Sequence, residues 1–173
     1  MSAMLGLGAI SIIMHDYSHI FTISGIFQSE LQFLLIFLNG LTPSGDHSYV
    51  DGLVQFLESW QWPRCMDSCA TALKKIDFTR DSFRCDSHVA TQIYSVIAWY
   101  LMTLPDDIIA LPPVQSYLKL SDVMDLLRCL RDGMVDHEVL ANAIITYLVA
   151  NRLAYGLIAV SYTHLTLPTM MSV

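Results

Sequence analysis

Three cysteines and one histidine have the spacing that comes closest to a metal site in this chain. Cys65 and Cys69 are separated by three residues, and Cys85 and His88 by two residues. Zinc prefers four sulfur or nitrogen ligands, and a two-residue gap lets one loop present two of them. However, cysteine often fills a helical core, and Cys65 and Cys69 lack a second half-site of standard spacing. We therefore expect core thiols and no cofactor, with zinc as the alternative.

Two further segments contain residue types that support catalysis in other proteins. His15 and His19 would lie one turn apart on a helix, where a third ligand could complete a metal site. Asp16 follows His15, however, so the glutamate of the HExxH motif is absent. The segment SGDHS, residues 44–48, contains the residue types of a hydrolase triad, but triad members converge from separate elements. We interpret it as a turn followed by a helix cap.

Paired carboxylates recur along the chain, but they have a structural explanation. We expect each pair at a helix start or in a turn, where acids meet the positive end of the helix dipole. Catalysis by paired carboxylates needs two acids that face one cleft, and nothing in the sequence indicates this. We expect no catalytic residue, with a fragment of a larger enzyme kept as an alternative. The pairs are Asp106 with Asp107, Asp122 with Asp125, and Asp132 with Asp136.

The composition is apolar and acidic. Hydrophobic residues make up 54% of the chain and charged residues 14%, against about 25% charged in a typical soluble domain. A large core, a membrane protein or a slice from a longer assembly would each explain this. The net charge of -7 argues against a nucleic-acid surface, which needs clustered lysine and arginine.

Cellular location can be predicted only in outline. The apolar stretches 20–41 and 144–160 contain polar interruptions, and a membrane span needs about 20 apolar residues. The N-terminus lacks the positive charge of a signal peptide, and four cysteines are too few for a disulfide scaffold. We expect an intracellular, cytoplasmic protein, with a helical membrane segment as the alternative.

The elements that must position these residues are predicted to be helices. Leu31, Leu34, Leu35 and Leu38 follow helical spacing, and further helices are predicted over 48–60, 65–76, 86–104 and 136–154. Pro112-Pro113 is expected to break the chain, and Ser121 to cap a helix that runs to Arg131. The predicted fold class is all-α.

One segment has the pattern of a helical hairpin repeat. Val50, Leu53, Val54 and Leu57 recur 73 residues later as Val123, Leu126, Leu127 and Leu130, about twice the length of a helical-pair repeat. Residues 120–151 have a leucine-rich helix, a Gly and Asp turn and an alanine-bearing second helix. They resemble an armadillo or HEAT repeat, although residues 136–139 (DHEV) depart from the usual valine-arginine step.

The resemblance implies an irregular helical-hairpin array, or a fragment of one, that acts as a protein–protein interaction scaffold without catalysis. Second helices of successive hairpins would line a face for an extended protein partner, of basic character given the acidic charge. Aromatic residues often anchor interfaces, and here they are Trp60, Trp62, Trp99, Tyr94 and Tyr100. Trp60 and Trp62, at a helix junction, are the best interface candidates. The sequence does not predict the oligomeric state.

The last residues are expected to lie outside the native domain. Residues 160–169 (VSYTHLTLPT) resemble the conceptual translation of a transposon-type sequencing adapter. This resemblance implies one helical domain over residues 1–159, as a fragment of a longer protein, followed by a non-native tail over 160–173. We expect this tail to contribute nothing to stability.

Overall fold

The computed structural model describes residues 26–41, 48–62, 87–130 and 134–156, with backbone only for 87–92 and 130. Most of these residues are helical and none of them lies in a strand, which confirms the all-α prediction for this part of the chain. The helices are α2 (Ile26–Gly40), α3 (Tyr49–Ser59), α5 (Ser87–Leu101), α6 (Asp106–Ile109), α7 (Pro112–Leu130) and α8 (His137–Tyr155).

Local sequence signals explain where several helices begin and end. Ser48 caps α3 in a capping box, in which its hydroxyl accepts from the backbone N–H of Asp51 at 3.0 Å and the Asp51 carboxylate accepts from the Ser48 N–H at 3.2 Å. Asp136 caps α8 by accepting from the Glu138 N–H at 2.9 Å. Gly156 ends α8 with φ of 72°, a conformation that glycine adopts without steric cost.

The prolines near residue 112 begin a helix rather than break the chain. Pro112 is the first residue of α7, where a missing backbone N–H costs nothing because that N–H has no partner in a helix. The same helix continues past Ser121, which is buried in its interior. The prediction that Ser121 caps a helix is therefore wrong. α5 also ends at Leu101, before the predicted Leu104.

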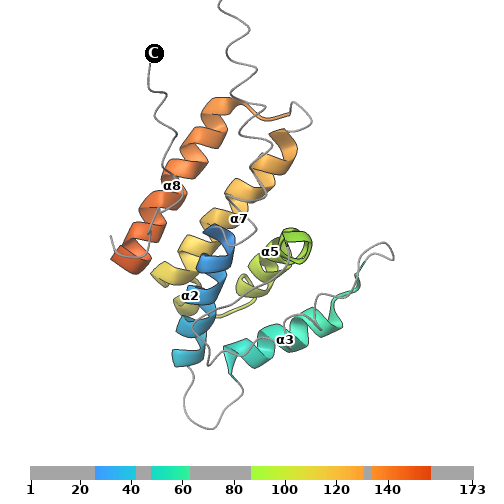
Figure 1. The fold of residues 1–173 in the computed structure, drawn as a ribbon. Coiled ribbons are helices and arrows are strands. Elements are labelled where there is room, and N and C mark those ends of the chain that lie inside the picture. Colours follow the sequence, from blue (N-terminus) through green and yellow to red (C-terminus); the bar gives the residue numbers. More distant parts are fainter. Residues whose placement is uncertain (1–25, 42–47, 63–86, 131–133, 157–173) are drawn as a thin grey trace, which may run out of the picture.

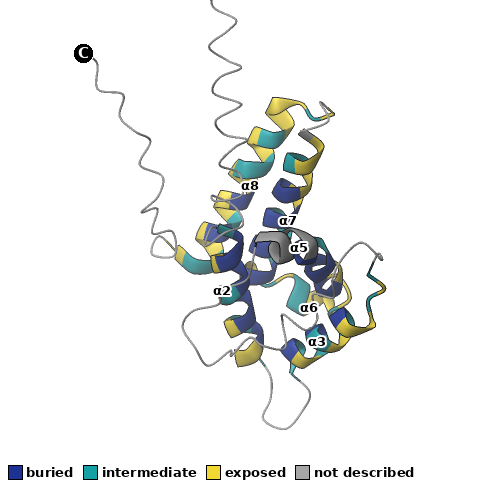
Figure 2. Cartoon of the chain, turned by 45° about the vertical axis from the view of Figure 1, so that its right-hand side comes forward, coloured by how far each residue is buried: buried dark blue, intermediate teal, exposed yellow. Residues whose placement is uncertain are grey.

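The long helices α7 and α8 run side by side as an antiparallel hairpin, and α2 crosses the same end of both (Figure 1). α5 packs against α7, and α3 lies beside α2 and α5. Buried residues, dark blue in Figure 2, concentrate where α2, α5 and α7 meet. Within the described residues, no helix combines the length and the apolar character needed to cross a bilayer.

Aromatic rings form the centre of this core. Phe27 of α2 lies against Tyr94 of α5 and Tyr117 of α7, with ring centroids 6.3 Å and 6.1 Å away. The Tyr117 hydroxyl donates to the Tyr94 carbonyl at 3.2 Å. A buried hydroxyl needs such a partner, so these rings fill volume and connect two helices without leaving that hydroxyl unpaired.

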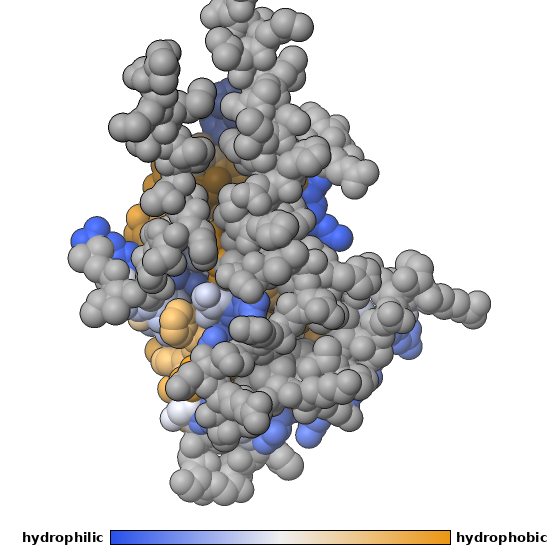
Figure 3. Space-filling model, in the orientation of Figure 1, coloured by the Kyte–Doolittle hydropathy of each residue, from blue (hydrophilic) through white to orange (hydrophobic). Residues whose placement is uncertain are grey.

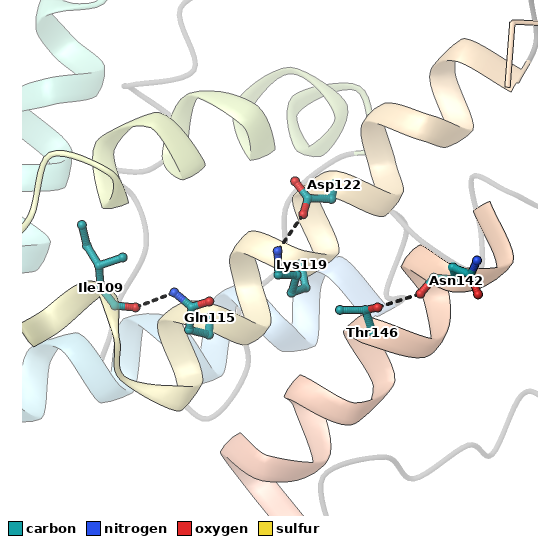
Figure 4. Close-up of polar contacts among 6 residues, drawn as sticks. All are labelled: Ile109, Gln115, Lys119, Asp122, Asn142 and Thr146. Atoms are coloured by element: carbon teal, nitrogen blue, oxygen red, sulfur yellow. Dashed lines mark hydrogen bonds and ion pairs between the residues drawn. The ribbon is translucent and has the colours of Figure 1, made fainter. Parts of the chain in front are cut away.

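Polar contacts on the surface of α7 join it to the segment before it and link side chains within the helix (Figure 4). The Gln115 side chain donates to the Ile109 carbonyl at 2.8 Å, which satisfies an acceptor at the end of α6. Lys119 and Asp122 form an exposed ion pair at 3.2 Å within α7. Exposed pairs of this kind contribute little, so the position of α7 depends mainly on its buried face.

The contact between α3 and α5 requires a glycine. The Tyr100 hydroxyl donates to the Tyr49 carbonyl at 2.6 Å, and a Cβ at Gly52 would lie 2.7 Å from that hydroxyl oxygen. Burial and the neighbouring Tyr49 raise the pKa of Tyr100 to about 12. The hydroxyl therefore keeps its proton, and remains a donor, across the physiological pH range.

Replacing Gly52 with alanine should destabilise the protein although alanine favours helix. The new methyl group would clash with the Tyr100 hydroxyl, and overpacking outweighs the propensity gain, so we expect a loss of about 1–2 kcal/mol. In a Tyr100→Phe background the nearest ring atom would lie 3.6 Å away, and the same substitution should be neutral or stabilising. Urea denaturation of the four proteins tests this. An equal effect of Gly52→Ala in both backgrounds would contradict it.

Candidate functional site

Three aromatic side chains meet at the surface where α3 ends beside α5. The Trp60 ring lies 5.7 Å from Phe56 at a tilt and 5.7 Å from Trp99 in an edge-to-face arrangement. We call Phe56, Trp60 and Trp99 the aromatic patch. Trp99 keeps 61% of its surface exposed, although a tryptophan ring gains most from burial. The patch therefore presents a large apolar ring to solvent in a fixed setting.

The local structure of α3 explains how Trp60 reaches this position. The chain leaves the helix at Trp60, whose φ of -66° and ψ of 128° are extended. Phe56 lies one turn earlier, on the side of α3 that faces the Tyr100 ring at 5.6 Å. The Trp62 indole N–H donates to the Leu57 carbonyl at 3.4 Å, one of the acceptors that a helix end leaves free. This bond holds the segment after α3 against the helix.

Trp99 faces outward because its neighbours on α5 face the core. Ile97, Ala98, Tyr100 and Leu101 are all buried, and in a helix this leaves one side for solvent. The edge-to-face contact between Trp99 and Trp60 connects α5 to the end of α3, two helices that are distant in sequence. The patch is therefore a property of the packed fold rather than of either helix alone.

The part of the chain that builds the patch is acidic. Residues 48–62 and 93–111, with described side chains, contain no lysine or arginine. They contain four carboxylates: Asp51, Glu58, Asp106 and Asp107. Carboxylates attract a cationic group, and such a group can also lie over the face of an exposed indole ring.

The second candidate site is a polar cluster inside the fold, where α2, α7 and α8 meet. Glu30 is buried, and its Oε2 accepts from the Asn151 amide at 2.7 Å and from the Tyr147 hydroxyl at 3.3 Å. The Ser116 and Tyr155 hydroxyls approach the same carboxyl but remain without a hydrogen-bond partner, as does Oε1 of Glu30. We call these five residues the Glu30 cluster.

The Glu30 cluster contains a titratable group in an unfavourable environment for charge. Burial raises the pKa of Glu30 above its usual value near 4.5, and the nearby polar groups of Ser116, Asn151, Tyr147 and Tyr155 oppose this only in part. Burial and the Glu30 carboxyl also raise the pKa of Tyr155, so its hydroxyl stays protonated. The cluster can position α8 on α2, and it makes stability depend on pH.

Two of the predicted carboxylates have separate structural partners. Asp125 accepts from the Tyr94 hydroxyl at 2.7 Å, and Arg128 donates to that hydroxyl at 3.3 Å while its guanidinium lies over the ring. Asp122 pairs with Lys119. Both acids lie inside α7, so the expectation that they occupy a helix start or a turn is wrong. Asp106, Asp107 and Asp136 do lie at helix starts.

The remaining site predictions have different outcomes. The zinc candidates Cys65, Cys69 and Cys85 lie outside the described residues, and His88 is described only by its backbone in α5. Among the described residues, no group of three or more histidine, cysteine and acidic side chains could hold a metal ion. The pair His15 and His19 and the segment 44–47 also lie outside, whereas Ser48 is the helix cap that we predicted.

The aromatic candidates divide into surface and core. Trp60 and Trp62 are partly exposed, as the interface prediction requires, and Trp99 joins Trp60 at the surface. Tyr94 and Tyr100 are buried and belong to the core. The Glu30 cluster was missed. The only sequence signal was the single charged residue of a mostly apolar helix, and its partners on α8 are 117 and 121 residues away.

The comparisons with known proteins leave the site to be interpreted from its own residues. No protein-family model, no curated protein and no solved structure matches this chain.

Proposed function

We propose that this chain is a helical protein-binding domain that recognises its partner at the aromatic patch. The exposed Trp99 ring, held edge-to-face against Trp60 at 5.7 Å, is the observation that carries the proposal. Tryptophan is among the residues that contribute most binding energy to protein interfaces. A ring already fixed by its neighbour loses little entropy when a partner binds, which favours affinity.

The partner chemistry follows from the charge around the patch. A segment that carries lysine or arginine could place a cation over the Trp99 ring face, beside helices whose described charged residues are all acidic. Arginine is the stronger candidate because its planar guanidinium also stacks on aromatic rings. We therefore propose a basic peptide segment of another protein as the ligand.

A helical-repeat architecture would suit this role, and we propose it as the finer description of the fold. The antiparallel α7–α8 hairpin supports this proposal, because such a unit is also built from two antiparallel helices (Figure 1). The echo between α3 and α7 is partial. Val50 and its counterpart Val123 are both buried, and Val54 and Leu127 are both partly buried, whereas Leu53 is buried and its counterpart Leu126 is only partly buried. α7 also begins eight residues before Leu120, so the first helix starts before the first residue of the proposed unit.

Selection from a library of random displayed peptides tests the binding function. We expect the full chain to enrich peptides that contain lysine or arginine. Trp99→Ala should bind them about tenfold more weakly or worse, a change of about 1.4 kcal/mol. Met102→Ala is the matched control, because Met102 follows α5 and is 62% exposed.

Two results would contradict the proposal. One is enrichment of acidic or uncharged peptides only. The other is equal binding by the wild type and Trp99→Ala when circular dichroism shows both to be folded. A loss of binding in Met102→Ala as large as in Trp99→Ala would place the binding surface beyond the aromatic patch, in the segment after α5.

A further inference from the structure

α8 has a second apolar stripe on the side that faces away from the described fold. Tyr147 and Asn151 are buried against α2. On the other side of α8, Leu148 and Val149 are exposed and Ile145 keeps 59% of its surface exposed. α8 is an edge helix in Figure 1, and Figure 3 shows apolar surface in the region of α8 and α2. Core packing therefore does not account for these three side chains.

The stripe has the spacing by which one helix recognises another. Glu138, Ile145 and Arg152 follow one another at intervals of seven residues, and Ala141 and Leu148 are also seven apart. This spacing keeps them on one side of a helix and is the pattern of a coiled-coil contact. We call Glu138, Ala141, Ile145, Leu148, Val149 and Arg152 the α8 outer face.

Its charges are arranged so that the face complements itself. Glu138 lies in the first turn of α8 and Arg152 in the last, and both are exposed. Each also suits the helix dipole, which explains the charges but not the exposed Ile145 and Leu148 between them. In an antiparallel pair centred on Ile145 and Leu148, Glu138 comes within about one turn of Arg152 of the second copy. A parallel pair would place like charges together.

We propose that the α8 outer face is a homodimer interface, in which α8 packs antiparallel against α8 of a second copy. A two-fold interface uses the same surface on both copies, so two ion pairs would flank one apolar centre. Thr146, beside this face, donates its hydroxyl to the Asn142 carbonyl at 2.8 Å (Figure 4). It therefore brings no unpaired donor to the edge of the contact. One helix face from each copy is a small interface, so we expect a dissociation constant in the micromolar range.

Sedimentation equilibrium of the full chain over a range of concentrations tests the dimer. We expect a reversible monomer–dimer equilibrium in the wild type. Ile145→Asp should be monomeric at all concentrations, because it places two carboxylates at the centre of the pair. Val139→Asp is the matched control: Val139 is 51% exposed on the same helix but off the seven-residue pattern, and this variant should dimerise like the wild type.

Charge exchange tests the antiparallel orientation. Glu138→Lys and Arg152→Glu should each weaken the dimer by about tenfold, because each places two like charges opposite each other at both ends of the interface. An equimolar mixture of the two variants should form a heterodimer, because opposite charges then face each other at both ends. The lysine introduced at position 138 of one copy would pair with the glutamate introduced at position 152 of the other, and the native Arg152 of the first with the native Glu138 of the second. Circular dichroism checks that each variant keeps its helix content, so that loss of dimer is not loss of fold.

The proposal is overturned if the wild type is monomeric at every concentration, or if Ile145→Asp dimerises as well as Val139→Asp. Failure of the mixture to associate would exclude the antiparallel pair. The dimer does not depend on the aromatic patch, so Trp99→Ala should dimerise normally. A dimer without peptide binding, or peptide binding without a dimer, would separate the two proposals.

Discussion

Replacing Phe27 with alanine should lower the free energy of unfolding by about 3–5 kcal/mol, the range for removing a buried aromatic ring. Phe27 is fully buried, and its ring contacts both Tyr94 and Tyr117. Its removal would leave a cavity between α2, α5 and α7. The loss of packing would also weaken the hydrogen bond from the Tyr117 hydroxyl to the Tyr94 carbonyl. Urea denaturation followed by circular dichroism measures the change.

Phe33 provides the control within the same helix. It is 37% exposed and contacts only one described ring, that of Tyr155 at 5.1 Å. We expect Phe33→Ala to cost about 1 kcal/mol, the scale of an ordinary substitution. If both variants lost the same free energy, the ring cluster around Phe27 would not be the centre of the core.

Replacing Asn151 with leucine should cost about 1–3 kcal/mol, because the buried Glu30 carboxyl loses its shortest hydrogen bond. Glu30→Gln should instead maintain or raise stability at neutral pH, because it removes the charge but keeps an acceptor for Asn151. In a Glu30→Gln background the cost of Asn151→Leu should be smaller. Thermal or urea denaturation of these four proteins measures the coupling between the two side chains.

The Glu30 carboxyl also determines whether the free energy of unfolding rises or falls with pH. Burial raises the pKa of Glu30 above 4.5, so the folded state binds this proton more tightly than the unfolded state. The stability that Glu30 contributes is complete below pH 4.5 and falls as the pH rises through the raised pKa. Glu30→Gln should flatten this part of the profile. A wild-type profile in which Glu30 adds stability as the pH rises would contradict the buried geometry.

Helix boundaries were predictable from sequence where the signal is local. Ser48 and Asp136 cap their helices because the bond from each side chain reaches a backbone N–H only two or three residues away. Pro112 was misread because proline both ends helices and begins them. The choice depends on whether the following face, here Val114 and Tyr117, can be buried. That burial is a property of the whole fold.

The roles of the aromatic and acidic residues could not be derived from spacing. Trp99 and Tyr100 are neighbours on α5, yet one is exposed and the other buried. The difference in burial depends on which side of α5 packs against α3 and α7. Glu30 is buried because Asn151, 121 residues later, supplies an amide to it. No local pattern contains that information.

Tryptophan fluorescence offers the most direct test of the binding function. Of the three tryptophans in the chain, Trp60 and Trp99 belong to the aromatic patch, so a ligand there should change the emission. We expect a saturable change when a lysine- or arginine-containing peptide from the selection is added. The change should be absent when the basic residues of that peptide are replaced by glutamate. The account would be contradicted if the glutamate peptide bound equally well, or if Trp99→Ala bound the basic peptide with the affinity of the wild type.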